Sequence, residues 1–218
     1  MGTYGSIPFT WQHPKLMSTP DVRVEGAILA GGRSSRMGRD KSALVLGGVS
    51  VLERVGGSMA PLVTRIRVIG NRVRESRGYV VQPDLREGLG PLSGIHAALA
   101  TAEAPSVLVI ACDLPFVTTK LLAGLIELLE NGIEAVVPRV SGRALPVLAL
   151  YRRACLERLE ARLDRGELKA QQFVASLATT YVDEDVLKRL DPQGICLKNI
   201  NTPEDFERAQ EIAGGELK

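Results

Sequence analysis

The sequence has few aromatic residues, histidines and cysteines, and these shortages exclude several kinds of protein. Aromatic residues make up 4% of its 218 residues, and the only two histidines are His13 and His96. Because no GxSxG motif accompanies them, a Ser/His/Asp hydrolase is not indicated. The three cysteines are widely spaced and form no CxxC pair, so neither a disulfide framework nor a zinc site is encoded. Such cysteine usage favours a reducing cytoplasm.

Long hydrophobic runs and a strong bias of charge are also missing. The longest run that looks buried, Val107 to Cys112, has the length of a strand, whereas a transmembrane helix needs roughly 18 residues. The formal net charge is +2, and the basic residues are spread along the chain. This pattern indicates neither a nucleic-acid partner nor a membrane partner.

What remains is the composition of a folded globular protein, with 45% hydrophobic and 24% charged residues. Residues 1–20 mix Gly, Ser, Pro and Thr without a helix or strand period, and we expect them to be an N-terminal tail or a vector leader. No linker interrupts the rest of the chain, so residues 21–218 are expected to form a single domain.

From Val24 onward, short apolar runs alternate with amphipathic stretches, which predicts an α/β protein. The fold expected is Rossmann-like, with three layers around a mostly parallel central sheet. Strands are predicted at Glu25–Ala30, Ile66–Gly70, Tyr79–Gln82, Val107–Cys112, Ala135–Pro138, Pro146–Tyr151 and Ile195–Lys198. Helices are predicted at Val51–Met59, Leu92–Ala102, Lys120–Asn131, Arg152–Leu163, Gln171–Leu177 and Pro203–Ala213.

The segment after the first strand, LAGGRSSRMGRDK, has the composition of a phosphate-binding loop. Gly31 and Gly32 allow the backbone to approach a ligand, while Arg36 and Lys41 can neutralise phosphate charge. A solvated glycine turn is the alternative. Neither GxxxxGK[ST] nor a GxGxxG directly after the strand occurs, so the Walker and dinucleotide-binding loops do not apply.

Four segments in order along the chain resemble the molybdenum cofactor guanylyltransferases, within the wider fold of the sugar-nucleotide and cytidylyl transferases. They are LAGGRSSRMGRDK, QPDLREGLGPLSGIHAAL, VLVIACDLPFV and NINTPEDFERAQ, which together span residues 25 to about 212. The resemblance implies a nucleotide-diphospho-sugar transferase-like fold and a single nucleotidyltransferase domain. It also implies that Arg36, Lys41 and Asp113 are catalytic.

Asp113 ends an apolar strand, where a carboxylate is unusual, and binding of Mg²⁺ would explain its presence. The alternative is an Asx turn before Pro115. Asn199 and Asn201 flank Ile200, so in a strand both amides would lie on one face and could approach the same metal. A turn leading into the helix cap at Thr202 is the alternative for these two.

The base of the nucleotide is expected beyond the predicted strands that Asn71 and Asp84 follow. Guanine offers two donors to a carboxylate, and the resemblance assigns both residues to the guanine-nucleotide site. Taken alone, each would be read as a turn former. The full set implied for nucleotide binding is Leu29, Ala30, Gly31, Gly32, Lys41, Asn71, Asp84 and Asp113.

Two further cations, Arg139 and Arg143, precede a strand and could contact a second anionic substrate. The segment from Arg165 to Lys169 could form another basic surface. Some members of the family have His-Pro where this chain has Leu145-Pro146, so no pterin contact is assigned to that position.

The activity implied is transfer of GMP from GTP to molybdopterin, with release of pyrophosphate and with Mg²⁺ as cofactor. The alternatives are a cytidylyltransferase of the same fold, acting on molybdopterin or an isoprenoid precursor, and a non-catalytic nucleotide-binding adaptor. Predicted protein partners are the molybdate-inserting enzyme and the apoenzymes that accept the finished cofactor.

Overall fold

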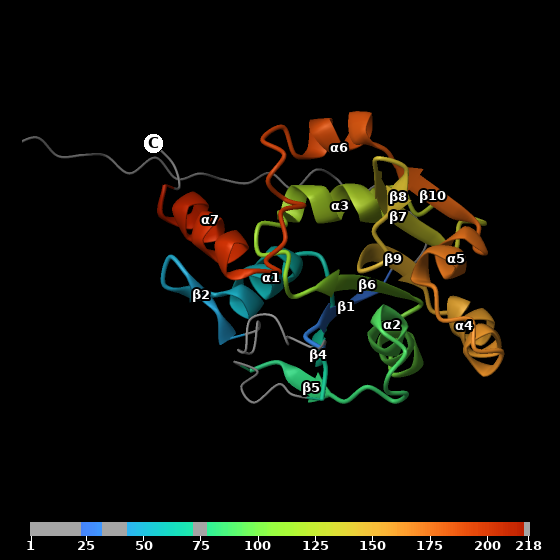
Figure 1. Ribbon diagram of the computed structural model, residues 1–218. Coiled ribbons are helices and arrows are strands. Elements are labelled where there is room, and N and C mark those ends of the chain that lie inside the picture. Colours follow the sequence, from blue (N-terminus) through green and yellow to red (C-terminus); the bar gives the residue numbers. More distant parts are fainter. Residues whose placement is uncertain (1–22, 32–42, 72–77, 216–218) are drawn as a thin grey trace, which may run out of the picture.

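Two six-residue strands, β1 (Val24–Leu29) and β6 (Ser106–Ala111), form the centre of the fold and are buried except for the partly exposed Ala111. They belong to a computed structural model that describes residues 23–31, 43–71 and 78–215 (Figure 1). The expected tail, residues 1–20, lies outside the described residues. Near-continuous apolar runs are typical of parallel strands that are covered on both faces.

The strands alternate with helices along the chain, as the sequence pattern predicts. The remaining strands are β2 (Val45–Leu46), β3 (Val49–Ser50), β4 (Ile66–Ile69), β5 (Val80–Gln82), β7 (Ala135–Val140), β8 (Arg143–Ala144), β9 (Leu148–Arg152) and β10 (Thr179–Val182). The helices are α1 (Val51–Met59), α2 (Pro91–Ala100), α3 (Thr119–Glu127), α4 (Cys155–Asp164), α5 (Ala170–Ala175), α6 (Glu184–Leu190) and α7 (Pro203–Gly214).

The main sheet has eight strands in the order β10-β7-β9-β6-β1-β4-β5, and β8 pairs with β7 beside this path. Strand β9 runs antiparallel to β6 and β7, and the other neighbours on the path are parallel. The predicted fold, a mostly parallel sheet in an α/β protein, is therefore confirmed.

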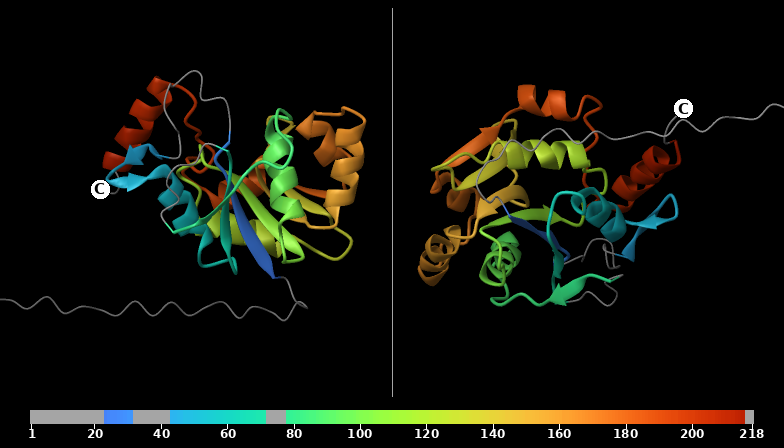
Figure 2. Two further views of the ribbon diagram at one scale, coloured as in Figure 1. Left: turned by 90° about the horizontal axis from the view of Figure 1, so that it is seen from below. Right: turned by 180° about the vertical axis from the view of Figure 1, so that it is seen from behind.

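Helices cover both faces of the sheet and form two hydrophobic cores. Helices α1, α3 and α6 pack on one face, while α2, α4 and α5 pack on the other (Figures 1 and 2). Each core is built from the alternating side chains of β1 and β6 and from the apolar stripe of the facing helices. This packing fixes the carboxyl ends of the parallel strands at one edge.

A third, smaller core lies outside the two layers, where α7 packs against the β2–β3 hairpin. It includes Leu46, Phe116 and Ile200, which are buried and come from three distant parts of the chain. Figure 1 shows α7 and the hairpin together at one side of the sheet. The residues after β6 are thereby tied to the segment that leads into α7.

Reciprocal capping boxes begin two of the helices, α1 and α7. The Ser50 hydroxyl accepts from the Glu53 N–H at 3.2 Å, and the Glu53 carboxylate accepts from the Ser50 N–H at 3.0 Å. Thr202 and Asp205 form the same reciprocal pair at the start of α7. Such pairs satisfy N–H groups that a helix start otherwise leaves without partners.

The predicted strand Ile195–Lys198 is wrong, because the structure has turns and loop there. The turn is held by its own polar contacts, and the Cys196 N–H donates to the Asp191 carboxylate at 2.8 Å. Strand β10 and helix α6, which the sequence pattern did not predict, are both short. Neither contains enough residues to show a clear period before tertiary packing selects it.

Candidate active site

The carboxyl ends of β5, β4, β1 and β6 lie side by side along one edge of the sheet. Leu29 of β1 is in register with Ile69 of β4 and Ala111 of β6. The ladder continues past the strands, because the Ala30 N–H donates to the Ile69 carbonyl at 2.8 Å and the Cys112 N–H to the Leu29 carbonyl at 3.0 Å. In open α/β sheets this edge is where ligands bind.

Gly70 lets the end of β4 approach the end of β1 closely. A Cβ atom on Gly70 would lie 2.9 Å from the carbonyl carbon of Ala30 and 3.0 Å from the nitrogen of Gly31. Both are backbone atoms, which cannot move aside as a side chain can. A Cβ on Gly31 would lie 3.4 Å from Oδ2 of Asp84, so the Asp84 carboxylate lies beside the Gly31 backbone.

Asn71 and Asp84 are joined by a hydrogen bond at this edge. The Asp84 N–H donates to Oδ1 of Asn71 at 2.8 Å, and Nδ2 of Asn71 donates to the carboxylate of Glu87 at 2.5 Å. Burial raises the pKa of Asp84, and the negative charge of Glu87 raises it further. Asn71 therefore positions the loop that presents the Asp84 carboxylate.

Asp113 follows β6 by two residues and is partly buried. Its carbonyl oxygen accepts the N–H of Ile200 at 2.9 Å, which fastens the segment before α7 to the end of β6. Ile200 is buried in the third core, between the exposed Asn199 and the partly buried Asn201. The expectation that a strand aligns the amides of Asn199 and Asn201 is wrong, because this segment is a loop. The loop nevertheless runs past Asp113, since Ile200 between the two asparagines bonds to the Asp113 backbone.

The remaining predicted site residues fall into two groups. Gly32, Arg36 and Lys41 lie outside the described residues. The side chain of Leu29 is buried and lies against α2, where a Cβ on Gly94 would come within 3.0 Å of it. Any contact of Leu29 with a ligand therefore belongs to its backbone.

The two basic segments predicted from the sequence carry less unpaired positive charge than the sequence suggested. Arg139 is paired with Asp183, with Nε 2.7 Å from Oδ1. Arg165 is paired with Glu167 at 2.7 Å. Carboxylates therefore offset the charges of Arg139 and Arg165, one cation in each of the two segments.

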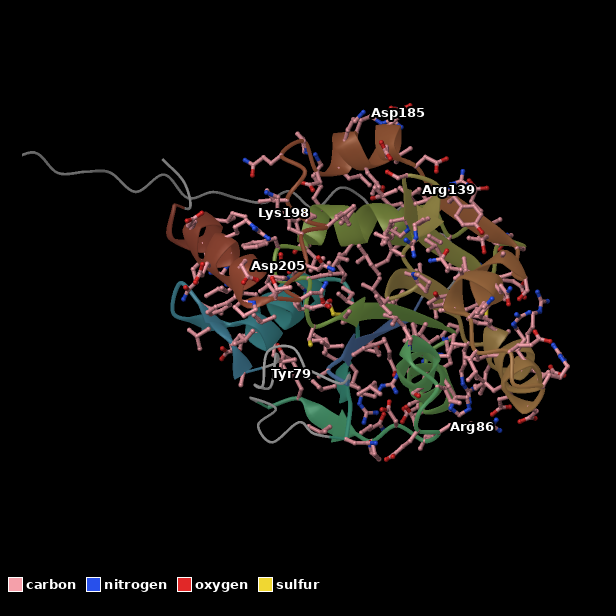
Figure 3. All side chains as sticks on the ribbon, viewed as in Figure 1. Tyr79, Arg86, Arg139, Asp185, Lys198 and Asp205 are labelled. Carbon is pink, nitrogen blue, oxygen red and sulfur yellow. The ribbon has the colours of Figure 1, made fainter. Side chains whose placement is uncertain are left out.

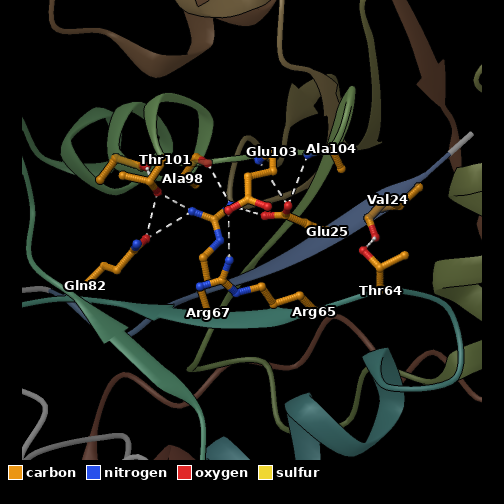
Figure 4. Close-up of polar contacts among 11 residues, drawn as sticks. Val24, Glu25, Thr64, Arg65, Arg67, Gln82, Ala98, Thr101, Glu103 and Ala104 are labelled. Carbon is orange, nitrogen blue, oxygen red and sulfur yellow. Dashed lines mark hydrogen bonds and ion pairs between the residues drawn. The ribbon is translucent and has the colours of Figure 1, made fainter.

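A buried polar network that the sequence did not predict surrounds Arg67 of β4, on the same side of β1 as Asp84 (Figure 4). Nη2 of Arg67 lies 3.0 Å from the carboxylate of Glu25, and Nη1 donates to Oε1 of Gln82 at 3.1 Å. Arg67 also donates to the hydroxyl of Thr101 and to the Ala98 carbonyl at the end of α2. One acidic and one basic residue inside neighbouring apolar strands were the signal available in the sequence.

The described residues have two general properties that limit the chemistry. No group of three or more His, Cys, Asp or Glu side chains among them could by itself hold a metal ion. No helix in the described part of the chain is long and apolar enough to cross a membrane.

The fold and this site define a nucleotidyltransferase. The model of the MobA-like NTP transferase domain matches residues 26–180, which include the predicted site residues from Leu29 to Asp113. The chain belongs to that family.

Similar curated proteins span nearly the whole chain. A probable molybdenum cofactor guanylyltransferase from Pelotomaculum thermopropionicum is 36% identical over 195 residues, covering 88% of this chain and 94% of that protein. A molybdenum cofactor guanylyltransferase from Desulfosudis oleivorans is 32% identical, covering 86% of this chain and 94% of the relative.

Solved structures share the fold. Molybdopterin-guanine dinucleotide biosynthesis protein A from Archaeoglobus fulgidus is similar with a TM-score of 0.74 and 29% identity, covering 88% of this chain and 99% of that one. A 2-C-methyl-D-erythritol 4-phosphate cytidylyltransferase from Thermus thermophilus has a TM-score of 0.66 at 21% identity, covering 89% of this chain and 100% of that one. The second likeness concerns the fold alone.

Proposed function

We propose that this chain transfers GMP from GTP to molybdopterin, which carries molybdenum in the cell, and releases pyrophosphate. The names of its curated relatives at 30–36% identity support the substrates. The geometric observation that carries the proposal is the arrangement of two carboxylates at one sheet edge. Asp84 lies beside Gly31 on the β5 side, and Asp113 follows β6, the strand next to β1 on its other side.

The guanine base would bind on the β5 side of this edge. The Asp84 carboxylate can accept both the N1–H and the exocyclic amine of guanine, a pair of donors that cytosine does not offer. The raised pKa of Asp84 reflects the partly buried setting, in which a charged hydrogen bond is stronger than in water. The contact of Asn71 with the Asp84 N–H holds the carboxylate in this place.

The phosphates would lie between the base and Asp113. The transfer is an in-line displacement at the α-phosphorus of GTP by the terminal phosphate of molybdopterin, and it needs no side-chain nucleophile. Arg36 and Lys41 are proposed to neutralise the departing phosphates, as the resemblance of their loop implies. The protein's main task is to orient two anionic substrates and offset their charge.

Mg²⁺ is the proposed cofactor, with Asp113 as its carboxylate ligand and Asn199 and Asn201 as neutral oxygen donors. The donor set fits, because Mg²⁺ accepts one or two protein carboxylates and completes its shell with phosphate oxygens and water. The hydrogen bond from the Ile200 N–H to the Asp113 carbonyl brings the backbone on either side of Ile200 up to Asp113, which supports this choice of ligands. When bound, the metal would supply positive charge at the reacting phosphates. The molybdate-inserting enzyme and the acceptor apoenzymes stay predicted partners, and the cytoplasm stays the predicted compartment.

Turnover with purified substrates tests this function directly. The full chain is incubated with molybdopterin, Mg²⁺ and either GTP or CTP, and pyrophosphate release is followed together with the dinucleotide product. We expect product with GTP and far less with CTP. Faster turnover of CTP would make the chain a cytidylyltransferase, and absence of pyrophosphate with every nucleotide would leave it a binding protein.

A further inference from the structure

A pocket lies at the opposite end of the same sheet edge from Asp84. It is open to solvent and has a volume of about 320 Å³ between the β7–β8 hairpin, α5 and β10. Its lining residues are Arg139, Gly142, Ala144, Gln171, Gln172, Ala175 and Tyr181. Known small-molecule pockets begin at about this volume, which suits a ligand of two or three fused rings.

The walls of the pocket are held in place before any ligand binds. Gln171 of α5 forms a reciprocal pair with the Ala144 backbone, donating to its carbonyl at 2.6 Å and accepting from its N–H at 3.2 Å. On the other side, the Ser141 N–H in the hairpin turn donates to the Glu184 carboxylate at 2.8 Å. The hairpin is therefore fastened to α5 and to the start of α6, which makes the pocket preorganised.

Arg139 is fixed in the pocket but brings little net charge to it. Its Nε and Nη2 donate to the two carboxylate oxygens of Asp183 at 2.7 and 2.9 Å. Its guanidinium carbon lies 4.5 Å from the centre of the Tyr181 ring (Arg139 is labelled in Figure 3). The bidentate pair and the stacked ring give a rigid, flat and nearly neutral surface.

The chemistry of the other lining residues favours a planar ring with a hydrogen-bonding edge. Gly142 has no side chain and Ala175 has only a methyl group, so neither fills the pocket that they line. Gln172 lies at the rim, and its amide makes no side-chain hydrogen bond to any other residue that the structure describes. An amide can both donate and accept, which matches the alternating groups of a 2-amino-4-oxopyrimidine ring.

The place of the pocket relative to Asp113 fits the acceptor substrate. The end of β6 is bound to the start of β9 through the Ala111 N–H and the Val147 carbonyl at 2.7 Å, and β9 is followed in the sheet by β7. Two strand spacings correspond to about 10 Å. The base site at Asp84 lies in the other direction from β6, so the two sites flank Asp113.

We infer that this pocket binds the pterin ring system of the acceptor, with the terminal phosphate of the same molecule reaching toward Asp113. This inference rests on the proposed function, because the acceptor named there supplies the ring. Guanine carries the same 2-amino-4-oxopyrimidine edge, so the test must separate the two substrates.

Filling the pocket is the sharpest test. Ala175→Met places a larger side chain into the pocket from an exposed position of α5 without removing a hydrogen bond. Ala161→Met, at an exposed position of α4, is the matched control. With GTP saturating, we expect the KM for molybdopterin to rise at least about tenfold in Ala175→Met, while the KM for GTP and the control stay within about twofold of wild type.

Gln172→Ala keeps the pocket open and removes one hydrogen-bonding group. We expect its KM for molybdopterin to rise about two- to tenfold, as the loss of one hydrogen bond predicts, with kcat nearly unchanged. An unchanged KM for molybdopterin in both variants would overturn the inference. An equal rise in the KM for GTP would assign the pocket to guanine and overturn it as well.

Direct binding of pterin keeps this test separate from the proposed function. Free pterin is titrated with the full chain and followed by its own fluorescence, in wild type and in Ala175→Met. We expect binding to wild type that is lost in the filled variant. If wild type transfers no guanylyl group, the proposed function fails but the pterin titration still decides the pocket. If wild type is active and pterin does not bind it, the pocket assignment fails alone.

Discussion

At the scale of single residues, Asp84 carries the most specific expectation, because its carboxylate lies beside the Gly31 backbone and is partly buried. Asp84→Asn replaces one acceptor by a donor and leaves a mismatch against guanine. The loss of a charged hydrogen bond is worth about 1.5–3 kcal/mol, so the ratio of kcat/KM for GTP over CTP should fall by about one to two decades. Asp185→Asn, at an exposed position of α6, is the control and should leave the ratio unchanged.

Lowering the pH should weaken the preference for GTP, as Asp84→Asn does. Because burial raises the pKa of Asp84, the carboxylate is protonated at a higher pH than an exposed aspartate, and the protonated form accepts one donor fewer. The preference for GTP should therefore be full above the folded-state pKa and decline as the pH falls through it. Asn71→Ala should weaken the preference less than Asp84→Asn does. A full GTP preference in Asp84→Asn would return Asp84 to the role of a turn residue.

Asp113→Asn removes a strand-end charge while keeping the size of the side chain. The fold should persist, since the hydrogen bond to Ile200 uses the Asp113 carbonyl and not its carboxylate. Metal-dependent turnover should fall by at least about two decades at ordinary Mg²⁺, measured as pyrophosphate release. Rates close to wild type would show that the metal assignment is wrong, and circular dichroism would verify that the variant is folded.

At the scale of elements, two adjacent glycines of α1 should respond in opposite directions to alanine. A Cβ on Gly56 would overlap the Tyr79 hydroxyl and ring, whereas a Cβ on Gly57 would meet no atom within 4 Å. Gly57→Ala should stabilise the protein by about 0.5–1 kcal/mol, the usual gain of alanine in an exposed helix. Gly56→Ala should destabilise it, because Tyr79 must move and takes the start of β5 with it. Urea unfolding of both variants decides this, and equal effects would contradict it.

The ion pair of Glu25 and Arg67 connects β1, β4 and the end of α2 (Figure 4). Burial lowers the pKa of Arg67, while the carboxylate of Glu25 opposes that shift. Arg67→Met leaves a buried carboxylate without its partner and should cost about 3–5 kcal/mol in the free energy of unfolding. Adding Glu25→Leu should recover much of that loss, which chemical denaturation of the single and double variants would measure. No recovery would mean that the other hydrogen bonds of the two side chains, from Arg67 to α2 and from the Glu103 and Ala104 N–H groups to Glu25, matter more than the charge pair.

At the scale of the whole molecule, a nucleotide bound as proposed would touch the ends of β5, β1 and β6 together, so its binding should stabilise the entire domain. Ligand at about 100 times its Kd adds about 2.7 kcal/mol, which for a chain of this size corresponds to roughly 5–10 °C in Tm. A thermal-shift screen of GTP, CTP, ATP and UTP with Mg²⁺ should show the largest shift for GTP. Equal shifts for all four would mean that the protein recognises phosphates only.

Local sequence signals were sufficient for the central strands, the apolar helix stripes and two of the helix starts. Val107–Cys112 was recognisable because a parallel strand covered on both faces needs no polar residue. The capping pair at Ser50 and Glu53 was recognisable because its two members are three residues apart. The mostly parallel α/β fold followed from the alternation of such elements. These features depend on neighbours in the chain, so the sequence alone determines them.

Features that depend on contacts between distant residues were decided by the tertiary structure. The segment Ile195–Lys198 looks like a strand, yet it forms turns that the contact of the Cys196 N–H with Asp191 holds, and the chain then enters the core between α7 and the hairpin at Ile200. Arg139 looks like a free cation, yet β10 and α6 bring Asp183 and Tyr181 against it. Burial and charge pairing arise only when the sheet places these residues side by side. Their spacing along the sequence does not show which of them will be close in space.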